Sequence, residues 1–97
     1  MPGTTLVHYV GLQLQTDSTL TSAQLDEVRN LFDSVSGEPT IVFQIGQYVH
    51  VRVNGGCATV LPDVQNMGWA LELLSFELGV ELYQADAAAC LSEVRQV

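Results

Sequence analysis

Two segments in which apolar residues alternate with other residues constrain the fold of this chain more than any other feature. Along the first segment, the even positions are Leu6, His8, Val10, Leu12 and Leu14. In the second, Tyr48 to Val53, positions 49, 51 and 53 are all valine. A period of two places successive side chains on opposite faces of a strand, so both segments predict half-buried β-strands. The β-rich stretch from Pro39 to Ile45 predicts a strand as well, either separate from the second segment or continuous with it through a kink.

A helix is predicted directly after the first strand. Thr21 is a suitable N-cap, and Gln24 stands at the position that completes a capping box. An apolar stripe at helical spacing follows, made up of Leu25, Val28, Leu31, Phe32 and Val35. Gly37 can adopt the left-handed conformation that ends a helix. The expected helix therefore begins after Thr21 and ends before Gly37.

The second half of the chain predicts further strands and two more helices. The sequence Asn54-Gly55-Gly56 predicts a hairpin turn, with Cys57 to Leu61 returning as a short strand. Pro62 and Asp63 open a helix that Gly79 ends, and Val80 to Tyr83 predicts a last strand. Asp86 is the expected cap of a final short helix that runs to Val94.

This order of elements predicts an α+β fold in which an antiparallel sheet packs on one layer of helices. The expected architecture is a two-layer sandwich, a ferredoxin-like βαββαβ core with an added C-terminal helix. At 97 residues the chain has the length of one hydrophobic core, so residues 1–97 are expected to form a single domain.

Charge is the most unusual global property of the sequence. Eleven acidic residues stand against three arginines and no lysine, which gives a net charge of −8. Direct binding to nucleic acid or to anionic membranes is not expected, because both present negative charge. A basic protein partner is favoured by the same electrostatics, although acidity also serves solubility alone.

The sequence also indicates a location and a thiol state. It has no apolar run of membrane-spanning length, and Met1 to Thr5 lacks the features of a secretion signal, so a cytoplasmic protein is expected. Cys57 and Cys90 lack CxxC spacing. We therefore expect both thiols to be reduced and structural, with Cys90 on the apolar side of the final helix.

No catalytic or metal-binding constellation emerges from the spacing of reactive residues. His8 shares a strand face with Val10 and Leu12 and is expected in the core, whereas His50 points to the opposite face. Asp26, Arg29 and Asp33 have the spacing of an ion-paired, solvated helix face. The glycines match neither phosphate-binding nor dinucleotide-binding patterns. We expect neither enzymatic activity nor a cofactor nor a bound metal.

The predicted second helix carries two apolar stripes. One stripe, suited to the core, is Val64, Met67, Leu71, Leu74 and Leu78. At about 100° per residue, Trp69, Leu73 and Phe76 lie on nearly the opposite side. Either the C-terminal helix folds back over these three residues, or they form an interface with a partner or a second copy.

A second candidate surface is the sheet face turned away from the helices. If the valines of the second alternating segment are buried, Tyr48, His50 and Arg52 point outward. Parity on the other strands places Tyr9, Gln13 and Tyr83 on the same face. Tyrosines are favoured at protein interfaces, although strands also carry ordinary half-exposed tyrosines.

The leading functional hypothesis is a non-enzymatic interaction module. It would inhibit or modulate a larger basic protein complex, such as one that handles nucleic acid, as small phage anti-defence proteins of the anti-CRISPR class do. No residue motif supports that comparison. One alternative is a dimeric acidic chaperone or adaptor, similar in size and charge to secretion chaperones. Another is a regulatory domain that binds a small molecule.

Overall fold

The computed structural model describes residues 3–96 and shows helices and strands from both halves of the chain in one unit. Met1, Pro2 and Val97, which belong to the expected domain, lie outside the described residues. In chain order the elements are β1 (Thr4–Gln15), α1 (Ser22–Ser36), β2 (Ile41–Ile45), β3 (Tyr48–Asn54), α2 (Cys57–Gln65), α3 (Gly68–Leu78), β4 (Tyr83–Gln84) and β5 (Ala89–Gln96).

β1 organises the antiparallel sheet because it pairs with three other strands. Within residues 3–96 the sheet has five strands in the order β2-β3-β1-β4, and β5 also pairs with β1. β4 pairs with the end of β1 at Leu14 and Gln15, while β5 pairs with residues 4–11. β4 and β5 therefore share one edge of the sheet, and β2 forms the opposite edge.

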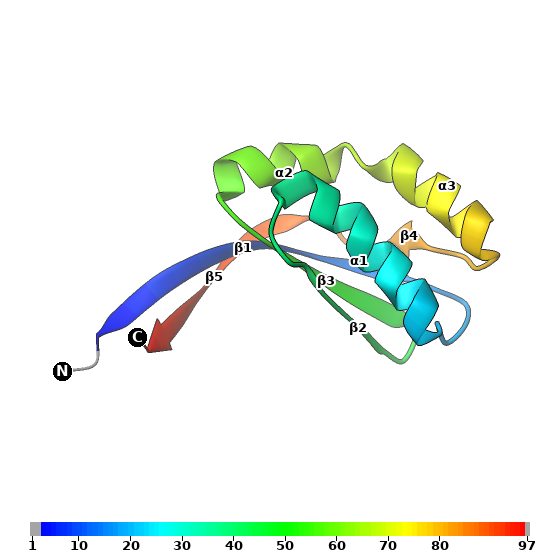
Figure 1. The fold of residues 1–97 in the computed structure, drawn as a ribbon, viewed down its shortest axis with the longest axis horizontal. Helices are drawn as coiled ribbons and strands as arrows, with labels where there is room; N and C mark the ends of the chain where they lie inside the picture. Colours follow the sequence, from blue (N-terminus) through cyan, green and yellow to red (C-terminus); the bar gives the residue numbers. More distant parts are fainter. Residues whose placement is uncertain (1–2, 97) are drawn as a thin grey trace.

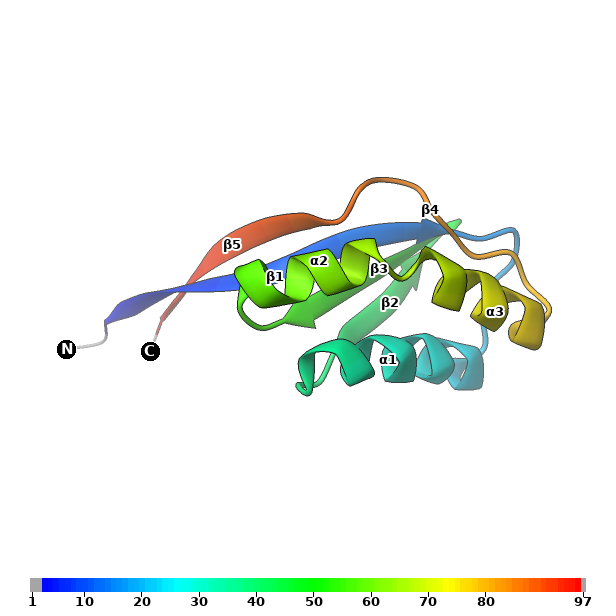
Figure 2. The ribbon, with the colours of Figure 1, turned by 90° about the horizontal axis from the view of Figure 1, so that it is seen from above.

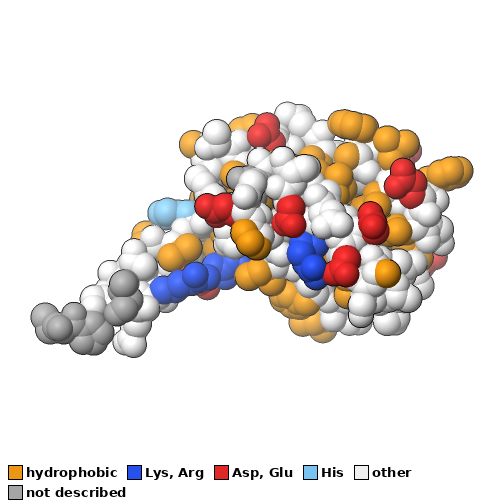
Figure 3. Space-filling model, viewed as in Figure 1, with side chains coloured by type: hydrophobic (Ala, Val, Ile, Leu, Met, Phe, Trp, Pro, Cys, Tyr) orange, Lys and Arg blue, Asp and Glu red, His pale blue; other side chains and the backbone are white. Residues whose placement is uncertain are grey.

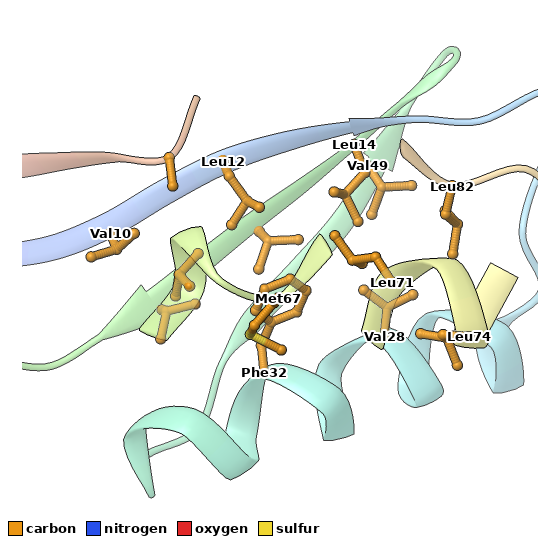
Figure 4. Close-up of a cluster of buried hydrophobic side chains, with 14 of the residues drawn as sticks. Val10, Leu12, Leu14, Val28, Phe32, Val49, Met67, Leu71, Leu74 and Leu82 are labelled. Carbon is orange, nitrogen blue, oxygen red and sulfur yellow. The ribbon is translucent and has the colours of Figure 1, made fainter. Parts of the chain in front are cut away.

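The three helices described cover one face of this sheet, which makes two layers (Figures 1 and 2). From the sheet, the alternate residues Val10, Leu12 and Leu14 point into the layer between, as the period of two predicts. Val28 and Phe32 of α1 meet them from the helix side, both fully buried (Figure 4). The α+β class and the antiparallel sheet are confirmed.

Both ends of the helix α1 lie where the sequence predicts them. Thr21 Oγ1 accepts a hydrogen bond from the Gln24 backbone N–H at 3.2 Å, and Gln24 Oε1 accepts one from the Thr21 N–H at 2.8 Å. Each bond satisfies an N–H that has no partner within the helix. At the other end Gly37 has a φ of 72°, and its N–H donates to Asp33 O.

The ferredoxin-like core with an added C-terminal helix is not confirmed, because the strand arrangement differs. Two strands, β4 and β5, stand where the ferredoxin-like core has one last strand. The predicted C-terminal helix is wrong, because residues 89–96 form β5. The predicted strand from Cys57 to Leu61 is also wrong, since these residues begin α2. Gly56 is the N-cap of α2 and not part of a hairpin turn.

Because residues 89–96 form the strand β5 and not a helix, the expected state of the two cysteines changes as well. Cys90 lies opposite Val10 in the β1–β5 register, on the face covered by helices, and Cys57 begins α2 above it. The two residues form a disulfide with Cα atoms 5.8 Å apart, so the expectation of reduced thiols is wrong. Disulfides persist mainly in oxidising compartments, which counts against the expected cytoplasmic location.

The outer halves of β1 and β5 extend beyond the helices as a two-stranded ribbon (Figure 2). The molecule measures 50 × 25 × 22 Å, and the ribbon lies along its longest dimension. No helix covers His8 there, so this residue is exposed and the expected core position is wrong. Leu6 is 57% exposed for the same reason.

Candidate protein-binding surfaces

The first candidate surface is a stripe on α3 that consists of Trp69, Leu73 and Phe76. These side chains are 70%, 56% and 89% exposed, whereas Leu71 and Leu74 on the other side of α3 are buried. The C-terminal segment that could have covered the stripe forms β5 and pairs along β1 instead. The interpretation that a C-terminal helix buries the stripe is therefore wrong.

Acidic side chains border the α3 stripe. At about 100° per residue, Glu72 and Glu77 lie on either flank of it, and both are exposed. A shallow groove of about 360 Å³ runs between α1 and α3, with Trp69 and Leu73 on its α3 side and Glu27 on its α1 side. Hydrophobic and acidic side chains lie side by side over α3 in the space-filling view (Figure 3).

The second candidate surface is the open sheet face, the side of the sheet that no helix covers. Cross-strand neighbours share a face, so the register shows which residues lie together. Tyr48, Gln15 and Tyr83 form one row across β3, β1 and β4. His50 lies between Phe43 of β2 and Gln13 of β1 in the next row. The outward direction predicted for the tyrosines agrees with this register.

Tyr9 and Arg52 lie on the open sheet face but are engaged with other side chains of the chain itself. The Arg52 guanidinium lies 4.0 Å from the centre of the Tyr9 ring. It also donates to Glu93 Oε1 at 2.6 Å and, through Nε, to Asn54 Oδ1 at 3.2 Å. Only 18% of the Arg52 side chain is exposed, so its first role is to hold three strands together.

His50 is held by its neighbours in the same way. Its ring stacks on Phe43 with centroids 4.9 Å apart, and its Nδ1 lies 3.4 Å from Gln13 Nε2. Both partners come from neighbouring strands. The polar residues at the centre of the open sheet face are therefore ordered before any partner binds.

Glu93 carries the strongest electrostatic perturbation in the described part of the chain. Hydrogen bonds from Arg52, and secondarily from Arg95, lower the pKa of Glu93 from 4.5 to about 2. The same bond to Glu93 raises the pKa of Arg52 above its ordinary value. Both cations pair with one carboxylate, so these three side chains together carry a net charge of about +1.

Sequence reasoning missed several residues of the open sheet face. Ile41, Phe43 and Ile45 of β2 lie on it, 46%, 45% and 62% exposed. These three residues are two positions apart within the stretch from Pro39 to Ile45, and this spacing predicts that they share one face of a strand. Leu91 and Glu93 could not be placed there because residues 86–94 read as a helix, in which period-two parity has no meaning.

A shallow hollow of about 400 Å³ lies on the open sheet face above Gly11. A β-carbon at Gly11 would stand 2.8 Å from Leu91 Cδ1, so glycine leaves room for the Leu91 side chain at the edge of the hollow. Among the residues that line the hollow, Arg52 and Asp86 are the charged ones. Its walls are otherwise apolar, aromatic or amide groups.

Across residues 3–96, no three His, Cys, Asp or Glu side chains form a group that could hold a metal ion. In the same residues no helix combines the length and the apolar character needed to cross a membrane. The two candidate surfaces lie on different layers, and the structure does not bring their residues together.

No protein-family model matches the chain, and comparisons with curated proteins and with solved structures likewise find no match.

Proposed function

We propose that this protein is a non-enzymatic interaction module that binds another protein through the α3 stripe. The observation that carries the proposal is the exposure of Trp69, Leu73 and Phe76 on the side of α3 opposite the core. Large apolar side chains are each worth about 1.5–3 kcal/mol when buried. Trp is among the residues most enriched at interface hot spots.

The chemistry around the α3 stripe supports a partner with a basic rim. Glu72 and Glu77 flank the stripe, and Glu27 borders the neighbouring groove. A second copy would bring these carboxylates against one another, which is unfavourable. A partner with an apolar pocket ringed by Lys or Arg would instead be attracted over the last ~10 Å of approach.

A narrower form of the proposal is that the partner is a basic protein that handles nucleic acid, and that binding inhibits or modulates it. The net charge of −8 supports this form, because nucleic-acid-binding surfaces carry the opposite sign. The same charge supports the proposal that the protein does not bind DNA, RNA or membranes directly. This narrower form places the protein in the cytoplasm, where the Cys57–Cys90 disulfide would have to withstand reduction.

Site-specific photo-crosslinking tests the role of the stripe. A photoreactive amino acid at position 76 should capture one dominant protein in cells, and the same group at position 65 should not. Gln65 is the matched control because it is an exposed residue of the neighbouring helix α2, outside the stripe. Equal capture from both positions would contradict the proposal.

The captured protein then allows a quantitative test. Phe76→Glu should weaken its binding by at least about 30-fold, the effect of losing a hot spot. Gln65→Glu introduces the same charge and should change the affinity by less than about twofold. Circular dichroism should show both variants folded, because neither residue contributes to the core. A Phe76→Glu variant that binds normally would exclude the stripe as the binding surface.

A further inference from the structure

The open sheet face is a second large apolar surface, and its chemistry differs from that of the α3 stripe. Six large hydrophobic side chains on it are between 42% and 62% exposed. They are Ile41, Phe43, Ile45, Tyr48, Tyr83 and Leu91. Monomeric proteins seldom leave apolar patches of more than about 300–600 Å² in water.

The size of this face is sufficient for a stable protein interface. A large aromatic side chain offers about 150–250 Å². Three of the six side chains are aromatic and three are the smaller Ile and Leu, so at roughly half exposure they present together at most on the order of 600 Å². The partly exposed Gln13 and His50 add to this area. The total approaches the ~800 Å² per partner of a standard interface.

The charge distribution on this face favours a copy of the same chain as the occupant. Two of the three arginines in the chain lie here, and both pair with Glu93. Asp86 is the acidic residue that borders the hollow. These two arginines and two carboxylates sum to zero charge, so two such faces can meet without the net acidic repulsion expected at the α3 stripe. Most of the acidic residues of the two copies would remain on the outer surfaces.

The layout of the face is also self-complementary. Ile41, Phe43 and Ile45 form an apolar flank on β2, and Tyr83 and Leu91 form another on the opposite edge. His50, Gln13 and Arg52 lie between the flanks. A two-fold axis in the plane between two facing sheets, directed along or across the strands, places an apolar flank on an apolar flank.

From these observations we propose that two copies of this chain pack face to face through the open sheet face. The dimer would have four layers, with a helix layer on each outer side. This arrangement leaves both α3 stripes exposed, so it is independent of the function proposed above. Little ordering is required on association, because Arg52 and His50 are already held by their neighbours.

Sedimentation equilibrium from about 1 μM to 1 mM protein, a range that covers ordinary affinities, tests the dimer. The wild-type chain should be a dimer at the upper end. Ile45→Glu should raise the dissociation constant by at least about 100-fold, because a two-fold interface contains two copies of the buried charge. Leu73→Glu is the matched control, since Leu73 is 56% and Ile45 62% exposed and the charge change is the same. It should leave the dissociation constant unchanged.

A second variant separates loss of apolar contact from charge repulsion. Ile45→Thr keeps a β-branched residue in the strand, removes apolar surface and should still weaken the dimer by about 10-fold or more. A wild-type chain that stays monomeric at 1 mM would overturn the proposal. So would a dimer that Leu73→Glu dissociates and both Ile45 variants leave intact, because association would then use the α3 stripe.

Discussion

At the scale of single residues, Glu93 and its two arginines explain how the last strand is fixed to the sheet. Arg52 of β3 reaches across β1, stacks on Tyr9 and pairs with Glu93 of β5. Arg95 pairs with the same carboxylate from within β5. The sequence places Arg52 on the outward side of its strand, but the pairing depends on β5, which local pattern does not predict.

The first prediction concerns the titration of Glu93. Arg52→Gln should raise the pKa of Glu93 from about 2 toward its ordinary 4.5, because the Arg52 hydrogen bond is the largest cause of the shift. Arg95→Gln should raise it by less. Carboxyl-detected NMR as a function of pH measures both values. An unchanged pKa in the Arg52 variant would show that the ion pair does not form in solution.

This shift also sets the pH range over which the ion pair stabilises the fold. A carboxyl whose pKa is lower in the folded than in the unfolded chain stabilises the folded state fully above the unfolded pKa. For Glu93 the contribution is complete above pH 4.5 and is lost as the pH falls toward about 2. The decline should be smaller in the Arg52→Gln variant.

At the scale of helices and strands, the elements that depend on local sequence were predicted well. β1 and β3 follow their alternation, and α1 begins and ends at the residues that cap it. The core stripe of the second predicted helix is also correct in its buried residues, although the helix breaks into α2 and α3 near Asn66 and Met67. These elements are predictable because the spacing of their apolar residues indicates one structure, and in α1 the capping residues indicate the same structure.

The elements that were missed depend on contacts distant in sequence. Residues 85–90 are mostly alanine, a strong helix former, yet the chain enters β5 because β1 offers an unpaired edge. Cys57 to Leu61 is a short apolar run, and such a run does not distinguish a strand from a helix. The outer part of the open sheet face depends on β5, so it could not be predicted.

The second prediction concerns the disulfide that ties β5 to α2. Replacing Cys57 and Cys90 together by serine should lower the free energy of unfolding by about 2–4 kcal/mol. Amide hydrogen exchange should accelerate first in β5, because a two-stranded ribbon is marginally stable alone. Ser92→Ala, an exposed change in the same strand, is the control and should have little effect. Two free thiols in the denatured, unreduced protein would show that the bond is not formed.

At the scale of the whole molecule, one apolar core coexists with two uncovered apolar surfaces. The core lies between the sheet and the helices, where residues from both halves of the chain meet (Figure 4). The α3 stripe and the open sheet face lie outside it, on different layers. The residues that stabilise the fold are therefore separate from those of the two proposed binding surfaces, although their chemistry is similar.

The third prediction compares two phenylalanines. Phe32→Ala should lower the free energy of unfolding by about 3–5 kcal/mol, because the Phe32 side chain is fully buried and its loss leaves a cavity. Phe76→Ala should change it by less than about 0.5 kcal/mol, because Phe76 is 89% exposed. Urea denaturation of both variants measures the difference. If Phe76→Ala lowered the free energy of unfolding as much as Phe32→Ala, Phe76 would have to be buried in a contact that this monomeric structure does not contain.

The disulfide also closes a covalent ring around part of the fold. Cys57 and Cys90 are 33 positions apart, and the ring contains α2, α3, β4 and the start of β5. Exposed residues of connecting segments within it, such as Asp86 and Ala87 between β4 and β5, are the kind of site that proteases cut. A chain cut once inside this ring stays a single covalent molecule, so the strand that completes the sheet is retained after cleavage.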